Sequence, residues 1–129
     1  MSERHRVLIV DDNPANVKLL RFVVAARGYE VRTAGDAGSA RRVLSEFDPA
    51  LILMDLQMPG TDGLTFTREL RADPRFAETV IVAVTAYAMK GDQERALEAG
   101  CDGYITKPVD TRGLGDELAT YLESGSRPR

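Results

Sequence analysis

The stretch LILMDLQMP, residues 51–59, places an acidic residue at the end of a run that has the pattern of a buried strand. Four apolar residues precede Asp55, and Pro59 follows soon after it. A short, continuous apolar run bounded by a turn signal is typical of a central strand in a parallel sheet. A carboxylate next to such a core costs free energy unless a partner compensates it. We therefore expect Asp55 to have a chemical role.

The rest of the chain alternates predicted strands with predicted helices. The predicted strands are residues 6–10, 29–34, 50–54, 80–86 and 104–106, and the predicted helices are residues 14–27, 37–47, 64–70, 91–100 and 114–123. Asn13 is the predicted N-cap of the first helix, and Gly28 ends it. Such alternation implies parallel strands joined by right-handed helical crossovers. The expected fold is α/β: a flavodoxin-like, doubly wound (βα)5 domain with a parallel five-stranded sheet of order 2-1-3-4-5.

Length and composition indicate a single globular domain. The chain has 129 residues, of which 43% are hydrophobic and 29% charged. We expect one domain over residues 1–123 and a disordered tail over residues 124–129. The net charge of −3 argues against a nucleic-acid partner. No apolar run approaches the roughly 20 residues of a membrane span, and the first residues lack the pattern of a signal peptide. Cys101 is the single cysteine, and we expect it to be a buried thiol. Together these features lead us to expect a cytoplasmic protein.

Three acidic residues follow strands that the predicted order makes neighbours. Asp11 and Asp12 come after the first predicted strand, and Asp55 comes after the third. In an open parallel sheet, ligands bind beyond the carboxyl ends of the strands, where the strand order reverses, and here that point lies between the first and third strands. We therefore expect all three carboxylates to meet in one crevice.

Close carboxylates repel one another, so positive groups should accompany them. Lys107 follows the fifth predicted strand and can supply an ammonium group at the same edge, while Thr85 ends the fourth and adds a hydroxyl group. The ligand set contains oxygen only, which suits a hard divalent cation, and Mg²⁺ fits better than Ca²⁺ because few protein ligands are present. Such a set can receive and stabilise a phosphoryl group on a carboxylate.

Four segments resemble the receiver domain of bacterial two-component response regulators. They are VLIVDDNP, LILMDLQMPGTDG, VIVAVTAYA and GYITKP, and the resemblance runs from about residue 5 to about residue 123. The ordered set of an acid pair, a lone aspartate, a threonine and a Lys-Pro pair is far more specific than any one of its members.

The resemblance implies a role for each of these acids. Asp55 would be the phosphoacceptor that attacks the phosphohistidine of a sensor histidine kinase or a histidine phosphotransfer protein. Asp12, Asp55 and the backbone carbonyl of Gln57 would bind Mg²⁺, with Mn²⁺ as an alternative ion. Asp11 would position the metal through water.

The resemblance also implies a switch. Lys107 would contact the phosphoryl oxygens, Thr85 would donate its hydroxyl group to them, and Tyr104 would then swing inward behind Thr85. The peptide bond between Lys107 and Pro108 is a candidate for the cis form. Gln57 and Tyr87 flank the site, where they either tune hydrolysis of the phosphoryl group or are merely exposed loop side chains.

Other functions fit the sequence less well. An FMN-binding flavodoxin would need a phosphate-binding loop where this chain has two acids, and an aspartate-nucleophile phosphatase of the haloacid dehalogenase type usually has a D-x-D motif and a cap domain. We therefore expect a phosphorylated signalling switch that is not a conventional enzyme and that acts on a downstream protein target. It is similar to single-domain cell-cycle regulators and to receivers of hybrid kinases. A fragment of a hybrid kinase, or a phosphorelay intermediate, is the alternative.

The start of the last predicted helix departs from the family pattern. Gly113 and Gly115 lie there, and each glycine costs roughly 1 kcal/mol relative to alanine inside a helix. We therefore expect this helix to begin late or to fray, and we expect a monomer.

Overall fold

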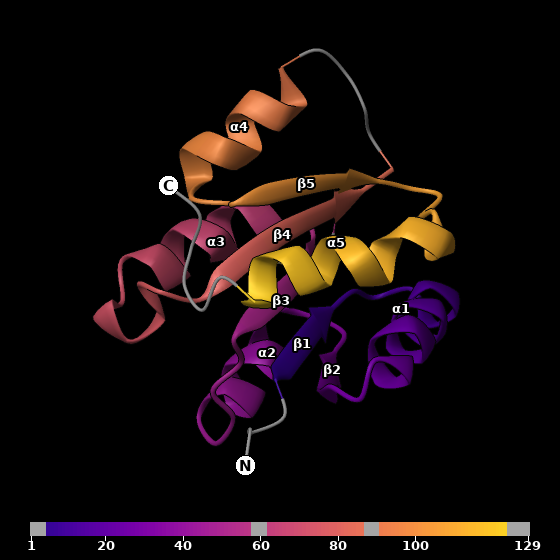
Figure 1. Ribbon diagram of the computed structural model, residues 1–129. Coiled ribbons are helices and arrows are strands. Elements are labelled where there is room, and N and C mark those ends of the chain that lie inside the picture. Colours follow the sequence, from indigo (N-terminus) through magenta and orange to yellow (C-terminus); the bar gives the residue numbers. More distant parts are fainter. Residues whose placement is uncertain (1–4, 58–61, 87–90, 124–129) are drawn as a thin grey trace.

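The computed structural model describes residues 5–57, 62–86 and 91–123. Within these ranges the chain forms one parallel sheet of five strands in the order β2-β1-β3-β4-β5, surrounded by helices (Figure 1). The predicted flavodoxin-like fold is confirmed. The tail over residues 124–129 lies outside the described residues, so its predicted disorder stays a prediction.

The strands and helices lie close to their predicted bounds. The strands are β1 Arg6–Val10, β2 Glu30–Ala34, β3 Leu51–Asp55, β4 Val80–Thr85 and β5 Gly103–Thr106. The helices are α1 Pro14–Ala26, α2 Ala37–Leu44, α3 Gly63–Arg71, α4 Asp92–Ala99 and α5 Thr111–Glu123, with a short 3-10 helix, η1, over Pro74–Phe76. Among the described residues, none of the helices combines the length and the apolar character required to cross a bilayer.

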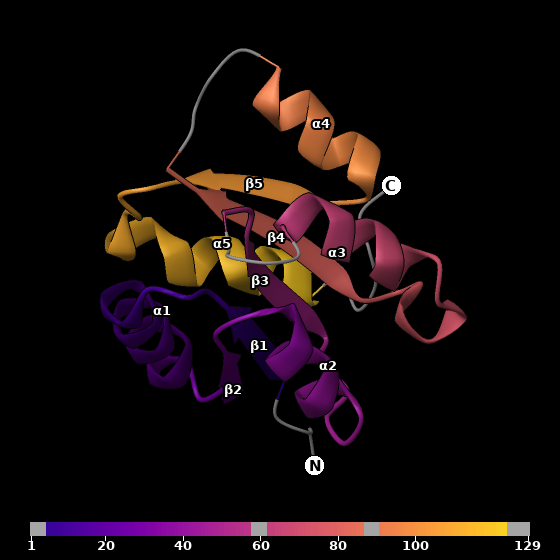
Figure 2. The same cartoon turned by 180° about the vertical axis from the view of Figure 1, so that it is seen from behind.

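The helices bury the two faces of the sheet in separate hydrophobic clusters. On one face, α1 and α5 pack through residues such as Leu20 and Leu118. On the other face, α2, α3 and α4 pack through residues such as Ala40, Phe66 and Ala96, and Figure 2 shows this face toward the viewer. Every residue of β3 is buried, as a strand covered on both faces requires.

Local capping explains where the first helix begins and ends. The side chain of Asn13 accepts hydrogen bonds from the backbone N–H groups of Ala15 at 2.9 Å and Asn16 at 3.3 Å. Gly28 follows the last turn with φ +83°, a conformation that glycine adopts without strain. Both predicted caps are confirmed. Cys101 is buried as predicted, and burial raises the pKa of its thiol to about 11.

The second helix is shorter than predicted. It ends at Leu44 instead of residue 47, because the Ser45 hydroxyl donates a hydrogen bond to the Arg42 carbonyl at 2.6 Å and Pro49 disfavours helical backbone at the residue before it. Phe47 is still buried, so its apolar spacing signalled the core and not the helix. The short helix η1 was not predicted.

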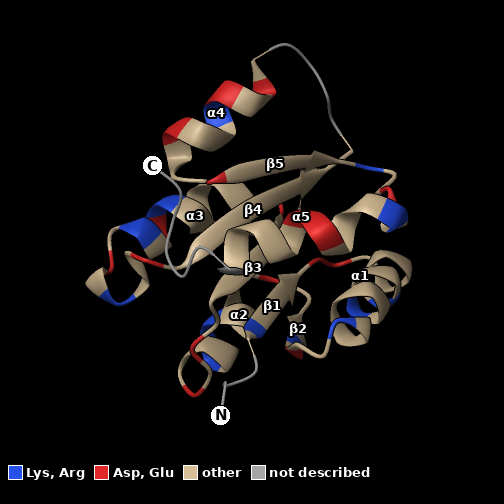
Figure 3. Cartoon of the chain, in the orientation of Figure 1, with Lys and Arg blue, Asp and Glu red and all other residues tan. Residues whose placement is uncertain are grey.

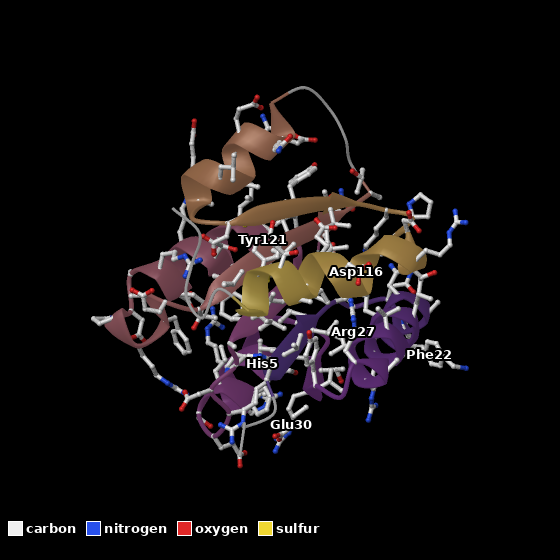
Figure 4. All side chains as sticks on the ribbon, viewed as in Figure 1. His5, Phe22, Arg27, Glu30, Asp116 and Tyr121 are labelled. Atoms are coloured by element: carbon white, nitrogen blue, oxygen red, sulfur yellow. The ribbon has the colours of Figure 1, made fainter. Side chains whose placement is uncertain are left out.

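The predicted late start of α5 is wrong, because the helix begins at Thr111. The backbone N–H of Arg112 donates to the Asp110 carboxylate at 3.0 Å, so Asp110 caps this end. A Cβ atom at Gly115 would lie 2.7 Å from Nε of Arg27, the C-cap residue of α1. Arg27 forms an ion pair with Asp116 of α5 (Figure 4). Gly115 therefore allows a contact between α1 and α5 that offsets the low helix propensity of glycine.

Candidate functional site

Three carboxylates meet at the carboxyl edge of the sheet, as predicted. Asp11 and Asp12 follow β1, and Asp55 ends the neighbouring strand β3, where Val10 pairs with Met54. One oxygen atom of each acid lies within 4.8 Å of the others. Asp11 and Asp55 are only 2% and 3% exposed, whereas Asp12 is open to solvent. Figure 3 shows the acidic segment between β1 and α1.

One oxygen of each buried acid is held by the backbone, which leaves the other for a ligand. Oδ1 of Asp11 accepts the backbone N–H of Asn13 at 2.9 Å, and Oδ1 of Asp55 accepts that of Gln57 at 3.0 Å. Oδ2 of Asp11 is buried, makes no hydrogen bond of its own within the described part of the chain and lies 3.2 Å from the ammonium group of Lys107. Because the lysine is shared with Asp55, this oxygen can also face a second cation. The donor set fits a hard, oxygen-binding cation such as Mg²⁺.

Lys107 contributes the positive charge that the sequence predicted. Its Nζ lies 3.2 Å from Oδ2 of Asp11 and 3.6 Å from Oδ2 of Asp55. The backbone N–H of Lys107 donates to the carbonyl of Thr85 at 2.7 Å, which fixes the lysine beside the end of β4. The peptide bond between Lys107 and Pro108 is cis, as predicted.

Ionisation of Asp55 is unfavourable in the folded protein, because the carboxylate is buried beside a second acid. The pKa of Asp55 is raised to about 6: burial is the largest cause and the neighbouring Asp11 acts in the same direction, while the N–H of Gln57 and the ammonium group of Lys107 lower it. One lysine therefore does not fully compensate two buried acids. A divalent cation would complete the compensation and keep Asp55 ionised at neutral pH.

Thr85 and Tyr104 line one cavity beside the acids. Thr85 is buried at the end of β4, and Tyr104 lies on β5, where it packs partly against the core. The cavity has a volume of about 280 Å³, and Gln57 also lines it. Nε2 of Gln57 is buried without a hydrogen-bond partner. Tyr87 lies outside the described residues, so its predicted role stays a prediction.

The structure adds to the site one residue, Gly63, for which the sequence predicts no role there. A Cβ atom at Gly63, the first residue of α3, would lie 2.4 Å from the carbonyl oxygen of Asp55 and 2.7 Å from Cα of Leu56. The backbone N–H of Gly63 donates to the Leu56 carbonyl at 3.3 Å. Gly63 therefore lets α3 begin directly against the strand end that carries Asp55. In the sequence, the pair Asp62–Gly63 indicates a turn, but such a signal does not show what the turn packs against.

Replacing Gly63 by alanine should disturb the acid cluster. The added methyl group would push on the backbone of Asp55, so Gly63→Ala should lower the free energy of unfolding by about 1–3 kcal/mol and weaken Mg²⁺ binding. Chemical denaturation and calorimetric titration measure the two effects. Gly38→Ala in α2 is the matched control, because a Cβ there meets only Asp36 at 3.6 Å. Equal Mg²⁺ affinity in Gly63→Ala and wild type would contradict this role.

Comparisons with known proteins agree with this geometry. The family model described as the response regulator receiver domain matches residues 7–119. The polar-differentiation response regulator DivK of Brucella ovis is 40% identical over 116 residues, which cover 90% of this chain and 94% of DivK.

Solved structures give the same result. The receiver domain of the sensor histidine kinase PA1611 from Pseudomonas aeruginosa, with a magnesium ion coordinated in its active-site cleft, is 33% identical with a TM-score of 0.84, over 94% of this chain and 99% of that one. The chemotaxis regulator CheY4 of Vibrio cholerae shares the fold, with a TM-score of 0.85 at 24% identity over 92% of this chain and 98% of that one. The chain belongs to the response regulator receiver domain family.

Proposed function

We propose that Asp55 is the phosphoacceptor of this receiver and that its phosphorylation depends on Mg²⁺. The observation that carries the proposal is the meeting of Asp11, Asp12 and Asp55 with the ammonium group of Lys107 at one edge of the sheet. An acid that only ended a strand would not require two further carboxylates and an ammonium group beside it. A site built to stabilise a phosphoryl group needs both the carboxylates and the cations.

Asp12, Asp55 and the backbone carbonyl of Gln57 would bind the metal ion, and Asp11 would hold it through water. Mg²⁺, with Mn²⁺ as an alternative, supplies charge neutralisation for the phosphoryl oxygens when it is bound. The buried Oδ2 of Asp11, which makes no hydrogen bond and, among the described residues, is paired only with the lysine it shares with Asp55, supports this assignment. So does the magnesium ion in the cleft of the Pseudomonas receiver domain.

The phosphodonor is the phosphohistidine of a sensor histidine kinase or a histidine phosphotransfer protein. A carboxylate oxygen of Asp55 attacks the phosphorus atom, the phosphorus–nitrogen bond breaks, and the imidazole leaves with the bonding electron pair and takes up a proton. The product is an acyl phosphate on Asp55. Lys107 offsets the negative charge on the phosphoryl oxygens, and Thr85 donates its hydroxyl group to one of them.

Phosphorylation changes the surface that the chain presents, and the chain signals through contacts of that surface with other proteins. Thr85 moves toward the phosphoryl group, and Tyr104 then turns inward, because both residues line the same cavity. Gln57 borders the site and affects how fast the chain hydrolyses its own acyl phosphate. We further propose that the chain works in the cytoplasm as a monomer.

The downstream step has two candidates. The likeness to DivK, a response regulator, favours a receiver that contacts a protein target. The likeness to the receiver domain of a sensor histidine kinase favours a part in a hybrid kinase or a phosphorelay. Transfer of the phosphoryl group from Asp55 to a histidine phosphotransfer protein would identify the second role.

The proposal is tested with a small-molecule phosphodonor. Incubation with phosphoramidate should add one phosphoryl group per chain in the presence of Mg²⁺ and none in the presence of a chelator, as measured by intact-protein mass spectrometry. Repeated turnover of a chromogenic phosphate ester would instead indicate a phosphatase.

Magnesium should also stabilise the fold. A ligand that binds only the folded state at 100 times its Kd adds about 2.7 kcal/mol to the free energy of unfolding. We therefore expect Mg²⁺ to raise the melting temperature, and Asp12→Asn to remove most of that rise. Asp116→Asn, which changes an exposed acid on α5, is the control and should keep it. An unchanged melting temperature at millimolar Mg²⁺ would argue against the metal site.

A further inference from the structure

The helix α4 is fixed firmly at its C-terminal end. Its C-cap is Gly100, whose φ is +117° and whose carbonyl accepts a hydrogen bond from Nε of Arg71 at 2.8 Å. The stem of Arg71 packs so closely that a Cβ at Gly100 would lie 2.5 Å from its Cγ. Arg71 also pairs with the buried Asp102 at 2.7 Å, and Asp102 accepts the backbone N–H of Ile81 at 2.9 Å. These bonds tie this end of α4 to α3 and β4.

In the part of the chain that the structure describes, the burial of α4 is concentrated away from its N-terminal end. Its N-cap, Gly91, offers no side-chain hydrogen bond, and the residues that α4 buries, Ala96 and Ala99, both lie in its C-terminal half. Asp92 and Arg95 form an ion pair across the first turn. The views in Figures 1 and 2 agree that α4 lies at the β5 edge of the sheet.

The first turn of α4 borders the cavity that Thr85 and Tyr104 line. Asp92 and Arg95 line this cavity of about 280 Å³ together with Gln57. The Asp92 side chain is 16% exposed and that of Arg95 is 59% exposed, so the pair extends from the cavity to solvent. Burial and the charge of Asp92 raise the pKa of Tyr104, and Arg95 acts in the opposite direction, so both charges act on the phenol group.

We propose that the Asp92–Arg95 pair is a latch at the mouth of this cavity that sets the fraction of resting molecules in which Tyr104 lies inside. When the ion pair is formed, it obstructs the path of the Tyr104 ring into the cavity. When the ion pair is broken, the first turn of α4 can move about the fixed end of the helix at Gly100. With its ring in the cavity, Tyr104 could accept a hydrogen bond from Nε2 of Gln57, which has no hydrogen-bond partner among the described residues of the resting structure. Arg95 is thus a positioning residue, and this role rests on the switch proposed above.

Removing the guanidinium group should favour the inward state before any phosphorylation. Exposed ion pairs of this kind are weak, so Arg95→Ala should raise the inward fraction of Tyr104 about twofold to fivefold in metal-free protein. Asp92→Asn should act in the same direction, and Arg95→Lys should restore the resting value in part. Arg75→Ala is the matched control, because Arg75 pairs with Asp48 at the opposite end of the sheet.

The measurement is ¹⁹F NMR of protein labelled with 3-fluorotyrosine, with the Tyr104 signal assigned from its loss in Tyr104→Phe. The shift of that signal between H2O and D2O reports solvent exposure and should fall in Arg95→Ala but not in Arg75→Ala. Equal exposure in wild type and Arg95→Ala would overturn the latch. Addition of beryllofluoride with Mg²⁺ tests the switch separately: a wild-type signal that does not respond counts against the proposed function.

Discussion

Asp55→Asn should abolish phosphorylation by any donor and, in metal-free buffer, make the fold more stable than wild type near neutral pH. The first effect follows because an amide cannot form the acyl phosphate. The second follows because the pKa of Asp55 is raised from 3.8 to about 6, so the folded state resists its ionisation.

The sign of the pH dependence is set by that raised pKa. The folded state holds its proton more tightly than the unfolded state, so the free energy of unfolding of wild type falls as the pH rises from about 4 through about 6. The raised pKa sets the size of this fall, and the coupling of Asp55 to Asp11 and Lys107 spreads it over several groups. We expect the free energy of unfolding to fall by about 1–3 kcal/mol. Asp55→Asn should lack this fall.

Urea denaturation of both proteins across this pH range, with a chelator present, measures the difference. Mg²⁺ should restore the stability of wild type and should affect Asp55→Asn less. A variant that unfolds readily in metal-free buffer would show that Asp55 is needed for the fold instead.

Lys107→Met should slow phosphorylation severely while the acids stay in place. Removing one preorganised charge that stabilises a transition state typically costs about 10²–10³ in rate. The ammonium group also lies 3.2 and 3.6 Å from the two buried acids, so the variant should depend more on Mg²⁺ for stability. Phosphorylation rates with phosphoramidate measure the main effect.

The control for this variant is Lys18→Met, which removes an exposed lysine from α1. It should phosphorylate at the wild-type rate with a small donor. A Lys107→Met rate within a few-fold of wild type would contradict the role of the ammonium group.

The sheet and the acid cluster could be predicted because both depend on local patterns. The apolar runs fix the strands, the alternation with helices fixes parallel pairing, and the resulting strand order puts Asp11, Asp12 and Asp55 at one edge. The position of Lys107 follows from the same rule. These inferences need no knowledge of individual side-chain contacts.

Several of the errors and omissions involve contacts between distant residues. Gly115 looked like a helix breaker because its contact with Arg27, the C-cap residue of α1, is not visible in the local sequence. Gly63 looked like an ordinary turn residue because its fit against the backbone of Asp55 appears only in the folded chain. The bonds of Arg71 to Gly100 and Asp102 join three separate segments, and no local pattern indicates them.

The central claim is that Asp55 is the residue that carries the phosphoryl group. The most direct measurement is to phosphorylate the chain in the presence of Mg²⁺, reduce the acyl phosphate with borohydride, and locate the product by peptide mass spectrometry. We predict that the reduced residue is Asp55, with none at Asp11 or Asp12. A reduced residue at any other position, or no reduced residue in a sample that has gained a phosphoryl group, would contradict the account.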